Sequence, residues 1–429
     1  MRIYCFKDQF VKYCIGIFIA TTVTILLFWS IVPGGWDERD AADYRSFYKP
    51  VALNLLVGKG LVTSDGSLAT RYPPGFPLIL AGLFSMAKLT GTPEHWWLQG
   101  FTLLAMGLAC VLLYGLTLMV IGKRVALIAA ILWMTYPFNL WLTKQPNSEI
   151  AFLPFFYGSL FLFGKVLWRG WNKLLLPLSV GALIGFAALV RPIAILIGIL
   201  LAGLLIALRW KNGWKHCVIP AALVLIGNIA VVMPWEILVW SRTGKWIPLS
   251  TGGVPGIRDG LTCALVTKGY RRPLKVPLAM RKVVTKAVEE WKQGGLKTTG
   301  DILAFLRKQA SENPIGVLQL FWWKMKRAWY GTDAQRSEER WILLIQAPYL
   351  LLALLGSWLL WRRGGRHREW FILSSLLVLY FWGMTTMVLS ILRYMVPAIG
   401  LLFPAIASLL DSALDNCRRN LTPLGGAVT

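Results

Sequence analysis

Acidic residues are scarce in this sequence, yet a group of them directly follows the first apolar segment. Asp37, Glu38, Asp40 and Asp43 precede Tyr44, although only 20 of the 429 residues are acidic. A solvated loop would account for such a group. At the edge of an apolar segment, however, a carboxylate is often functional, and it could act as a general base on a hydroxyl group. We therefore take Asp40 and Asp43 as candidate catalytic residues, with Asp37 third.

Two further carboxylates stand near the ends of apolar segments. Glu149 follows Asn147-Ser148, which fits the capped start of a helix where the helix dipole favours negative charge. This structural role is compatible with a catalytic one, so Glu149 is a further candidate catalytic residue. Glu236 follows Pro234-Trp235 near the end of its segment, and we expect its side chain to extend to the membrane interface.

Three arginines also lie at helix edges against apolar sequence, namely Arg71, Arg191 and Arg393. A single arginine there usually anchors a helix at the interface. Three of them on the outer side, where topology does not favour positive charge, indicate a shared anionic ligand. Guanidinium groups bind phosphate through paired hydrogen bonds. The three are therefore candidate phosphate-binding residues.

The residue types and their spacing do not indicate a metal site or a nucleotide-binding site. The three histidines lie far apart and the six cysteines have no metal-ligand spacing. Phosphate-binding glycine loops and serine nucleophile elbows are also missing from the sequence. No metal ligand is predicted, and the sequence leaves open whether a divalent metal assists.

Composition identifies the class of protein that carries these residues. Hydrophobic residues make up 56% and charged residues 15% of the chain, whereas soluble proteins have about 25% charged residues. Apolar runs recur from Val11 to Leu410, which predicts an all-α polytopic membrane protein embedded in the lipid bilayer. Basic residues that flank membrane helices account for the net charge of +25, so no nucleic-acid partner is expected.

The loops predict about ten transmembrane helices, with one further apolar run that does not cross. If run 75–90 stays at the outer surface, every short basic loop falls inside, as the positive-inside rule requires. This run is also shorter than the ~20 residues that a crossing needs. The predicted crossings are 11–33, 96–121, 124–143, 150–168, 174–190, 192–209, 217–240, 341–361, 370–390 and 394–411.

The topology divides the chain into three parts. Residues 1–240 form a transmembrane catalytic module with a first external loop, 34–73, and a juxtamembrane helix, 75–90. Residues 241–340 form an external, periplasmic region with predicted helices at Leu278–Lys292 and Pro314–Tyr330. Residues 341–429 form the C-terminal transmembrane helices and a cytoplasmic tail. We expect Cys263 outside, and Cys217 and Cys417 at or beyond the inner face.

Short motifs follow one another along nearly the whole chain. They are Asp40-x-x-Asp43-Tyr44, Ala52-x-Asn54-Leu55-x-x-Gly58-x-Gly60, Arg71-Tyr72-Pro73-Pro74-Gly75-Phe76-Pro77, Ser148-Glu149, Leu189-Val190-Arg191-Pro192, Pro234-Trp235 with 247–253, and Arg393-Tyr394-x-x-Pro397. In this order they resemble bacterial GT-C glycosyltransferases, the relatives of protein O-mannosyltransferases and of the aminoarabinose transferase that modifies lipid A. One departure is the spacing from the acidic group to Ala52, which is about one helical turn longer than usual.

The resemblance implies a GT-C-like fold and a multi-pass enzyme of the bacterial inner membrane whose active site faces the periplasm. Such enzymes take a sugar from a polyprenyl-phosphate donor and transfer it, with inversion, to a glycan, lipid or protein acceptor. The resemblance makes Asp40 the first choice for the base, because Tyr44 reproduces the family's spacing, and Asp43 nearly its equal. The base should lie across the sugar from the arginines, and Glu149 should hold the acceptor or tune the base.

Two other functions remain as alternatives. A transporter or flippase of lipid-linked saccharides would place polar groups near the bilayer midplane, often in repeated halves. Here the charges lie at the outer edge and no repeat is visible. A polymer ligase, which joins a whole glycan, would share the basic external loops.

Overall fold

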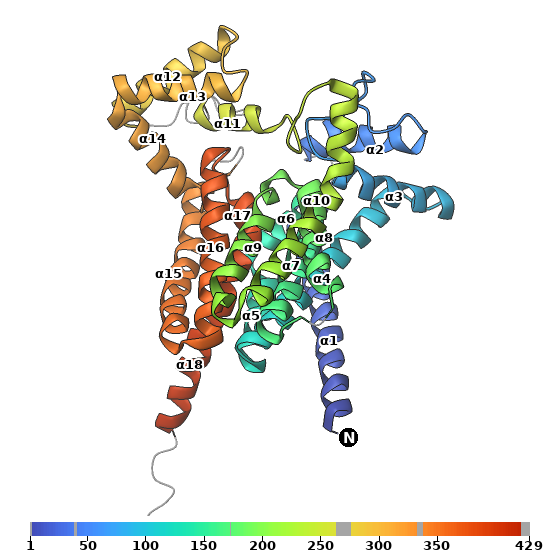
Figure 1. The fold of residues 1–429 in the computed structure, drawn as a ribbon, viewed down its shortest axis with the longest axis vertical. Helices are drawn as coiled ribbons and strands as arrows, with labels where there is room; N and C mark the ends of the chain where they lie inside the picture. Colours follow the sequence, from blue (N-terminus) through green and yellow to red (C-terminus); the bar gives the residue numbers. More distant parts are fainter. Residues whose placement is uncertain (1, 38–40, 172, 263–275, 333–337, 422–429) are drawn as a thin grey trace, which may run out of the picture.

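The computed structural model describes residues 2–37, 41–171, 173–262, 276–332 and 338–421. Helices make up nearly all of the regular structure there, and the described residues form no strand beyond an isolated bridge between Val62 and Leu68. The described residues of the ranges 32–74 and 244–338 lie at one end of the helix bundle, the loop end, and the start of α1 and the end of α18 project from the opposite, terminal end (Figure 1). The expected all-α class is confirmed.

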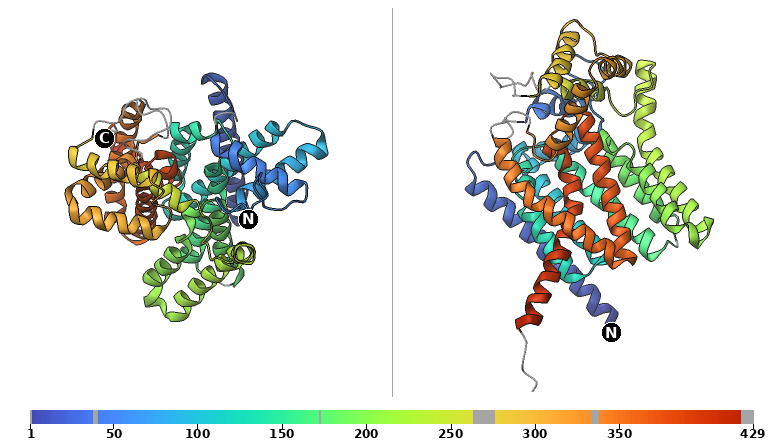
Figure 2. Two further views of the ribbon diagram at one scale, coloured as in Figure 1. Left: turned by 90° about the horizontal axis from the view of Figure 1, so that it is seen from above. Right: turned by 90° about the vertical axis from the view of Figure 1, so that its left-hand side faces the viewer.

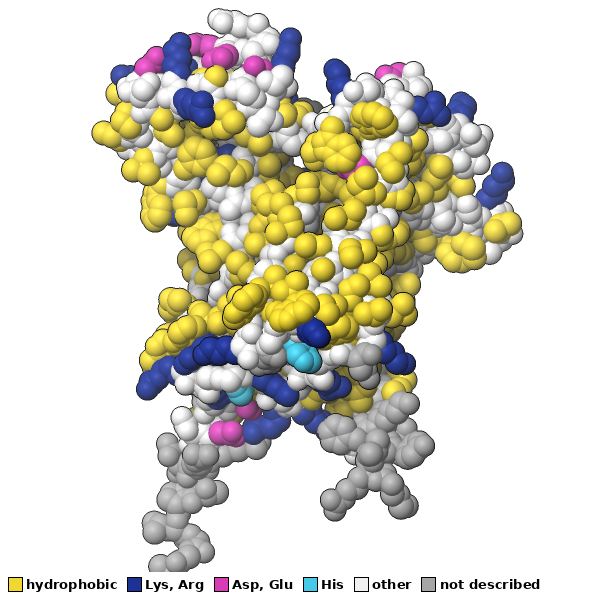
Figure 3. Space-filling model, in the orientation of Figure 1, with side chains coloured by type: hydrophobic (Ala, Val, Ile, Leu, Met, Phe, Trp, Pro, Cys, Tyr) yellow, Lys and Arg dark blue, Asp and Glu magenta, His cyan; other side chains and the backbone are white. Residues whose placement is uncertain are grey.

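On the face drawn in Figure 3, an apolar belt covers the middle of the bundle, as expected for a protein embedded in lipid. Eight helical stretches in the described part of the chain are long and apolar enough to cross a membrane. The helices that provide these stretches are α1 (Arg2–Ile31), α4 (Glu94–Val120), α7 (Ser148–Arg169), α9 (Ile197–Arg209), α10 (Trp214–Thr243), α15 (Glu339–Arg363), α16 (Gly365–Met387), and α17 (Leu392–Ile399) with α18 (Phe403–Leu421).

Shorter helices complete the predicted set of about ten crossings. One is α8 (Leu175–Val190). The run expected to cross as a single helix over 124–143 is instead divided into α5 (Lys123–Thr135) and α6 (Pro137–Leu142). The physical reason is Pro137, because proline disfavours the helical conformation of the residue before it. Tyr136 accordingly has φ −65° and ψ 119°.

The helix α3 (Gly75–Thr90) does not cross the bundle, as the loop charges predicted. At its start, a Cβ on Gly75 would lie 2.7 Å from the backbone of Leu189, near the loop end of α8. Shortly after its end, Glu94 pairs with Lys49 of the first loop at 2.8 Å. Both ends of α3 therefore lie at the loop end of the bundle.

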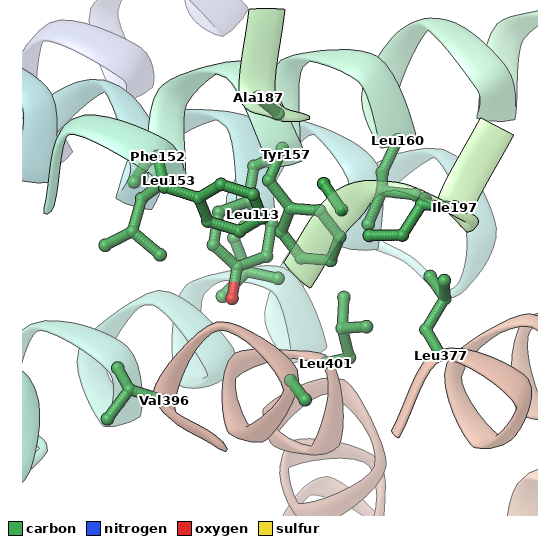
Figure 4. Close-up of a cluster of buried hydrophobic side chains, with 14 of the residues drawn as sticks. Leu113, Phe152, Leu153, Tyr157, Leu160, Ala187, Ile197, Leu377, Val396 and Leu401 are labelled. Carbon is green, nitrogen blue, oxygen red and sulfur yellow. The ribbon is translucent and has the colours of Figure 1, made fainter. Parts of the chain in front are cut away.

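The helices pack around one large hydrophobic core. Figure 4 shows its centre, where Leu113 of α4, Phe152 and Tyr157 of α7, Leu377 of α16 and Leu401 meet. Tyr157 donates a hydrogen bond of 2.7 Å to the carbonyl of Pro397. This contact joins the first half of the chain to α17.

The long loop forms a small helical unit with its own core. It contains α11 (Gly253–Thr262), α12 (Leu278–Lys292), α13 (Thr299–Glu312) and α14 (Pro314–Arg327). Its core residues include Met280, Val283 and Phe305. In the view from above in Figure 2, this unit covers the C-terminal helices, and the first-loop helices lie on the other side.

A buried ion pair attaches this unit to the bundle. Arg327 at the end of α14 is 2% exposed and pairs with Glu339 at the start of α15 at 2.6 Å. Arg327 also donates to the carbonyl of Ser390, at 3.1 Å. The position of α14 is thereby tied to the segment that leads into α17.

Thiol labelling tests the assignment of the two ends. Cys417 is exposed and lies at the terminal end, whereas Cys217 is buried and should not react. The predicted external position of Cys263 lies outside the described residues. In a Cys5→Ser, Cys263→Ser background, an impermeant maleimide should label Cys417 only from the cytoplasmic side. A Gln293→Cys variant, exposed at the loop end, should label only from the outside, and labelling of both from one side would contradict the topology.

Candidate functional site

The carboxylate of Glu149 is the centre of a charged cluster at the loop end. It lies in the first turn of α7, where Asn147 caps the helix by accepting a hydrogen bond of 3.0 Å from the backbone of Ile150. This confirms the cap that the sequence predicted. The Glu149 side chain is only 6% exposed, and a buried charge requires close partners of the opposite sign.

Two arginines from distant parts of the chain supply these partners. Arg191 Nη1 lies 2.5 Å from Glu149 Oε1, and Arg393 Nε lies 3.3 Å from the same oxygen. Arg191 has an extended backbone between α8 and Pro192, a conformation that the following proline favours. Arg393 lies in the first turn of α17. One carboxylate thus fixes two guanidinium groups.

Tyr394 lies next to both arginines. Its ring centroid is 5.0 Å from the guanidinium carbon of Arg191 and 5.2 Å from that of Arg393. Such cation–π contacts hold a guanidinium group without using its hydrogen-bond donors. Arg191 also donates a hydrogen bond of 3.2 Å to the Ser148 hydroxyl.

Asp43 reaches the cluster from the first loop. Its Oδ2 lies 3.9 Å from Arg393 Nη2, and its side chain is 45% exposed. The chain then forms one turn of π-helix, η1 (Tyr44–Tyr48), which continues into α2 (Lys49–Leu56). A π-helical turn holds more residues than an α-helical one and is frequent at functional sites. It accounts for part of the long spacing between the acidic group and Ala52.

Tyr72 orients the Asp43 side chain. Its hydroxyl donates a hydrogen bond of 3.3 Å to Asp43 Oδ1, and its ring stacks on Tyr48 at 5.1 Å. Burial and the negative charge of Asp43 raise the pKa of Tyr72 to about 12. The hydroxyl therefore keeps its proton at neutral pH and remains a donor to Asp43.

Arg71 borders the cluster and stays exposed. Its guanidinium carbon lies 5.4 Å from the ring centroid of Tyr72, and it forms no ion pair with a described residue. The long loop holds the backbone next to Arg71 in place, because the Thr251 backbone donates a hydrogen bond of 2.8 Å to the carbonyl of Thr70. A Cβ on Gly252 would lie 2.5 Å from the Arg71 carbonyl oxygen, so only glycine permits this approach.

Glu236, near the end of α10, helps to position the part of the long loop that contacts Arg71. The prediction that it extends to the interface is wrong, because Glu236 is buried and accepts a hydrogen bond of 2.7 Å from the backbone of Leu249. Trp235 donates to the carbonyl of Leu249 at 2.9 Å. The two side chains hold Leu249 at a φ of 58°, which turns the start of the long loop toward Arg71.

The structure therefore brings Asp43, Glu149, Arg191 and Arg393 together and places Arg71 beside them. Asp40 lies outside the described residues, and the Asp37 backbone donates to the carbonyl of Lys144 at 2.7 Å. No group of three or more His, Cys, Asp or Glu side chains comes together as a metal site in the described part of the chain.

Sequence reasoning assigned no role to the tyrosines of the site. Tyr72 and Tyr394 each follow one of the candidate arginines directly. This repeated Arg-Tyr pairing was the available signal, since an aromatic ring next to an arginine can hold its guanidinium group.

Comparisons with known proteins give one family match and several structures with a similar fold. Residues 71–240, less than half of the chain, match the family described as dolichyl-phosphate-mannose-protein mannosyltransferase. The archaeal oligosaccharyltransferase AglB from Archaeoglobus fulgidus, in complex with an inhibitory peptide and a dolichol-phosphate, superimposes with a TM-score of 0.52 at 14% identity, over 97% of this chain and 52% of that one. Its apo form gives 0.55 at 14% identity, with the same coverage.

A further structural match is ArnT from Cupriavidus metallidurans bound to undecaprenyl phosphate, with a TM-score of 0.40 at 14% identity over 99% of this chain and 81% of that one. A search of curated proteins gives no significant match. The chain spans about half the length of the oligosaccharyltransferase structures that it matches. The fold shared with the oligosaccharyltransferase structures confirms the predicted GT-C-like membrane fold.

Burial predicts different consequences for the two carboxylates. Glu149→Gln would leave two guanidinium groups without their buried anion, which typically costs about 3–5 kcal/mol of stability. Asp43→Asn would remove a long, part-exposed pair and should cost less than about 1 kcal/mol. Thermal unfolding of both purified variants in detergent measures the difference. Equal melting temperatures would contradict the central role of Glu149.

Proposed function

We propose that this protein is an integral membrane glycosyltransferase. It transfers a sugar from a polyprenyl-phosphate donor to a glycan, lipid or protein acceptor at the outer face of the bacterial inner membrane, with inversion. The observation that carries the proposal is the cluster in which Glu149 fixes Arg191 and Arg393 beside Asp43 at the loop end. The fold shared with an oligosaccharyltransferase in complex with a dolichol-phosphate supports it.

The cluster has the charge that a carrier phosphate requires. Two guanidinium groups share the carboxylate of Glu149, and Asp43 lies 3.9 Å from Arg393, so the formal charges of these four side chains balance and the net positive charge comes from Arg71. Arg71 adds an exposed guanidinium group at the edge of the cluster. The phosphate gains negative charge as the glycosidic bond breaks, and donors that are already in place stabilise that charge.

Asp43 is the better candidate for the base among the described carboxylates. Glu149 Oε1 already interacts with both arginines, whereas the half-exposed Asp43 receives one side-chain hydrogen bond from the described residues, from Tyr72 to Oδ1. Its Oδ2 can therefore face an acceptor hydroxyl. Asp40 remains a candidate from the sequence, and Glu149 takes the role of a positioning residue for the arginines.

The reaction follows from these roles. Asp43 accepts the proton of the acceptor hydroxyl while the oxygen of that hydroxyl forms a bond to the anomeric carbon. The bond from that carbon to the phosphate oxygen breaks on the opposite side, and the polyprenyl phosphate leaves with the electron pair, held by the arginines. The sugar has to enter between Asp43 and Arg393, whose 3.9 Å contact is long enough to be replaced.

The position of the cluster favours transfer over transport. A transporter places its polar groups near the bilayer midplane, whereas these residues lie at helix ends beside the external loops. The short basic loops at the opposite end support an external site, because such loops remain in the cytoplasm.

Asp43→Asn should lower transfer by about 10²–10⁴-fold, the usual effect of losing a general base. The measurement is release of polyprenyl phosphate from labelled lipid-linked sugars in membranes with matched protein levels. Asp40→Asn is the paired variant, and retention of most activity there would select Asp43. Normal activity in both variants would remove the first loop from the mechanism.

The arginines should act through phosphate binding. Arg71→Ala should lower the rate by about 10²–10³-fold, the cost of losing one donor to developing charge. Arg71→Lys keeps the charge but not the paired donors and should retain part of the activity. Arg242→Ala, a change of an exposed arginine at the same end, is the matched control. A normal rate for Arg71→Ala would show that Arg71 does not contact the donor.

A further inference from the structure

The terminal end of the bundle contains a large cavity that the proposed reaction does not use. Its volume is about 1030 Å³. It lies where α7 and α9 end and where α8, α10 and α16 begin, so five helices contribute to its wall. A cavity of this size is comparable to the larger pockets that hold small molecules.

The cavity wall is strongly basic. Lys165, Arg169, Arg209 and Arg366 line it, and Glu369 is its one carboxylate among the lining residues. Glu369 is already matched by Arg209, through two contacts of 2.6 and 2.9 Å. The charges of the other cations are therefore not balanced by a lining carboxylate. In Figure 3, Lys and Arg side chains form a band below the apolar belt at this end.

Neutral donors and helix dipoles add to this positive field. The indole nitrogen of Trp171, a lining residue, is buried and has no hydrogen-bond partner among the described residues. The helices α8, α10 and α16 all direct their first turns to the cavity, through Leu176, His216 and Gly365. Helix N-termini carry partial positive charge and favour anions.

The remaining wall is apolar. Val166, Leu167, Leu176 and Leu205 line it, and they belong to helices that continue into the apolar belt. A ligand that fits both parts has an anionic head and a hydrocarbon tail. Basic pockets between transmembrane helices on the cytoplasmic side suit lipid phosphates.

We propose that this cavity binds the phosphate head group of an anionic phospholipid from the inner leaflet. The lipid would bridge α7 and α16, which are otherwise joined here by Trp168 and Glu369 at 2.7 Å and by Arg366 and the Trp168 carbonyl at 3.2 Å. The site is separate from the charged cluster at the loop end and does not depend on the transfer reaction.

The test compares two double variants of the full chain. Lys165→Gln with Arg169→Gln removes two cations that line the cavity, and Arg362→Gln with Arg368→Gln removes two at the same end that do not. Native mass spectrometry of delipidated protein titrated with phosphatidylglycerol gives the affinity. Each cation near a lipid phosphate contributes about fivefold, so the first variant should bind about 25-fold more weakly. The control variant should bind like the unmodified protein.

Melting temperatures distinguish a lipid head group from a soluble phosphate as the ligand. Phosphatidylglycerol should raise the melting temperature of the unmodified protein, whereas phosphatidylcholine and inorganic phosphate should not, because a ligand stabilises the fold only if it binds it. Stabilisation by inorganic phosphate alone would replace the lipid with a soluble anion. Equal lipid binding by the two double variants would overturn the site.

Discussion

The architecture of the loop end depends on one buried carboxylate. Glu149 cannot remain charged in an apolar environment without partners, and it finds them in Arg191 and Arg393. The requirement acts in both directions, because each guanidinium group also needs an anion when it leaves water. Three segments far apart in sequence must therefore meet at one point. The start of α7, the α8–α9 turn and the start of α17 are each held by this contact.

Close backbone contacts bring the remaining parts to the same point. Gly75 lets α3 approach the chain directly before Arg191, and Gly252 lets the long loop lie against Arg71. Glu236 and Trp235 fix the turn that precedes Gly252 through Leu249. The short motifs quoted from the sequence thus serve two purposes. Some supply charged side chains, and others supply the small residues and turns that position them.

The sequence predicted the helices well because their signals are local. Apolar periodicity gave the bounds of α12, and loop charges showed that α3 does not cross. The partners of each side chain depend on tertiary contacts, so the sequence could not show that Glu149 holds two arginines or that Glu236 is buried. The base was expected across the sugar from the arginines, and the sequence did not show that Asp43 lies 3.9 Å from Arg393. The π-helical turn after Asp43 has no simple sequence signal either.

Positive charge gathers at both ends of the bundle, but it is held differently. At the loop end, Arg191 and Arg393 are fixed by an ion pair and by the ring of Tyr394, which limits the positions that a bound phosphate could take. Catalysis requires such fixed geometry, because a displacement of about 1 Å can lower the rate 100-fold. At the terminal end, Lys165 and Arg169 line a wide cavity, and Arg169 is exposed. An exposed cation such as Arg169 suits the retention of a lipid, where charge matters more than exact alignment, so the fixed geometry of the loop end is the one that fits the proposed reaction.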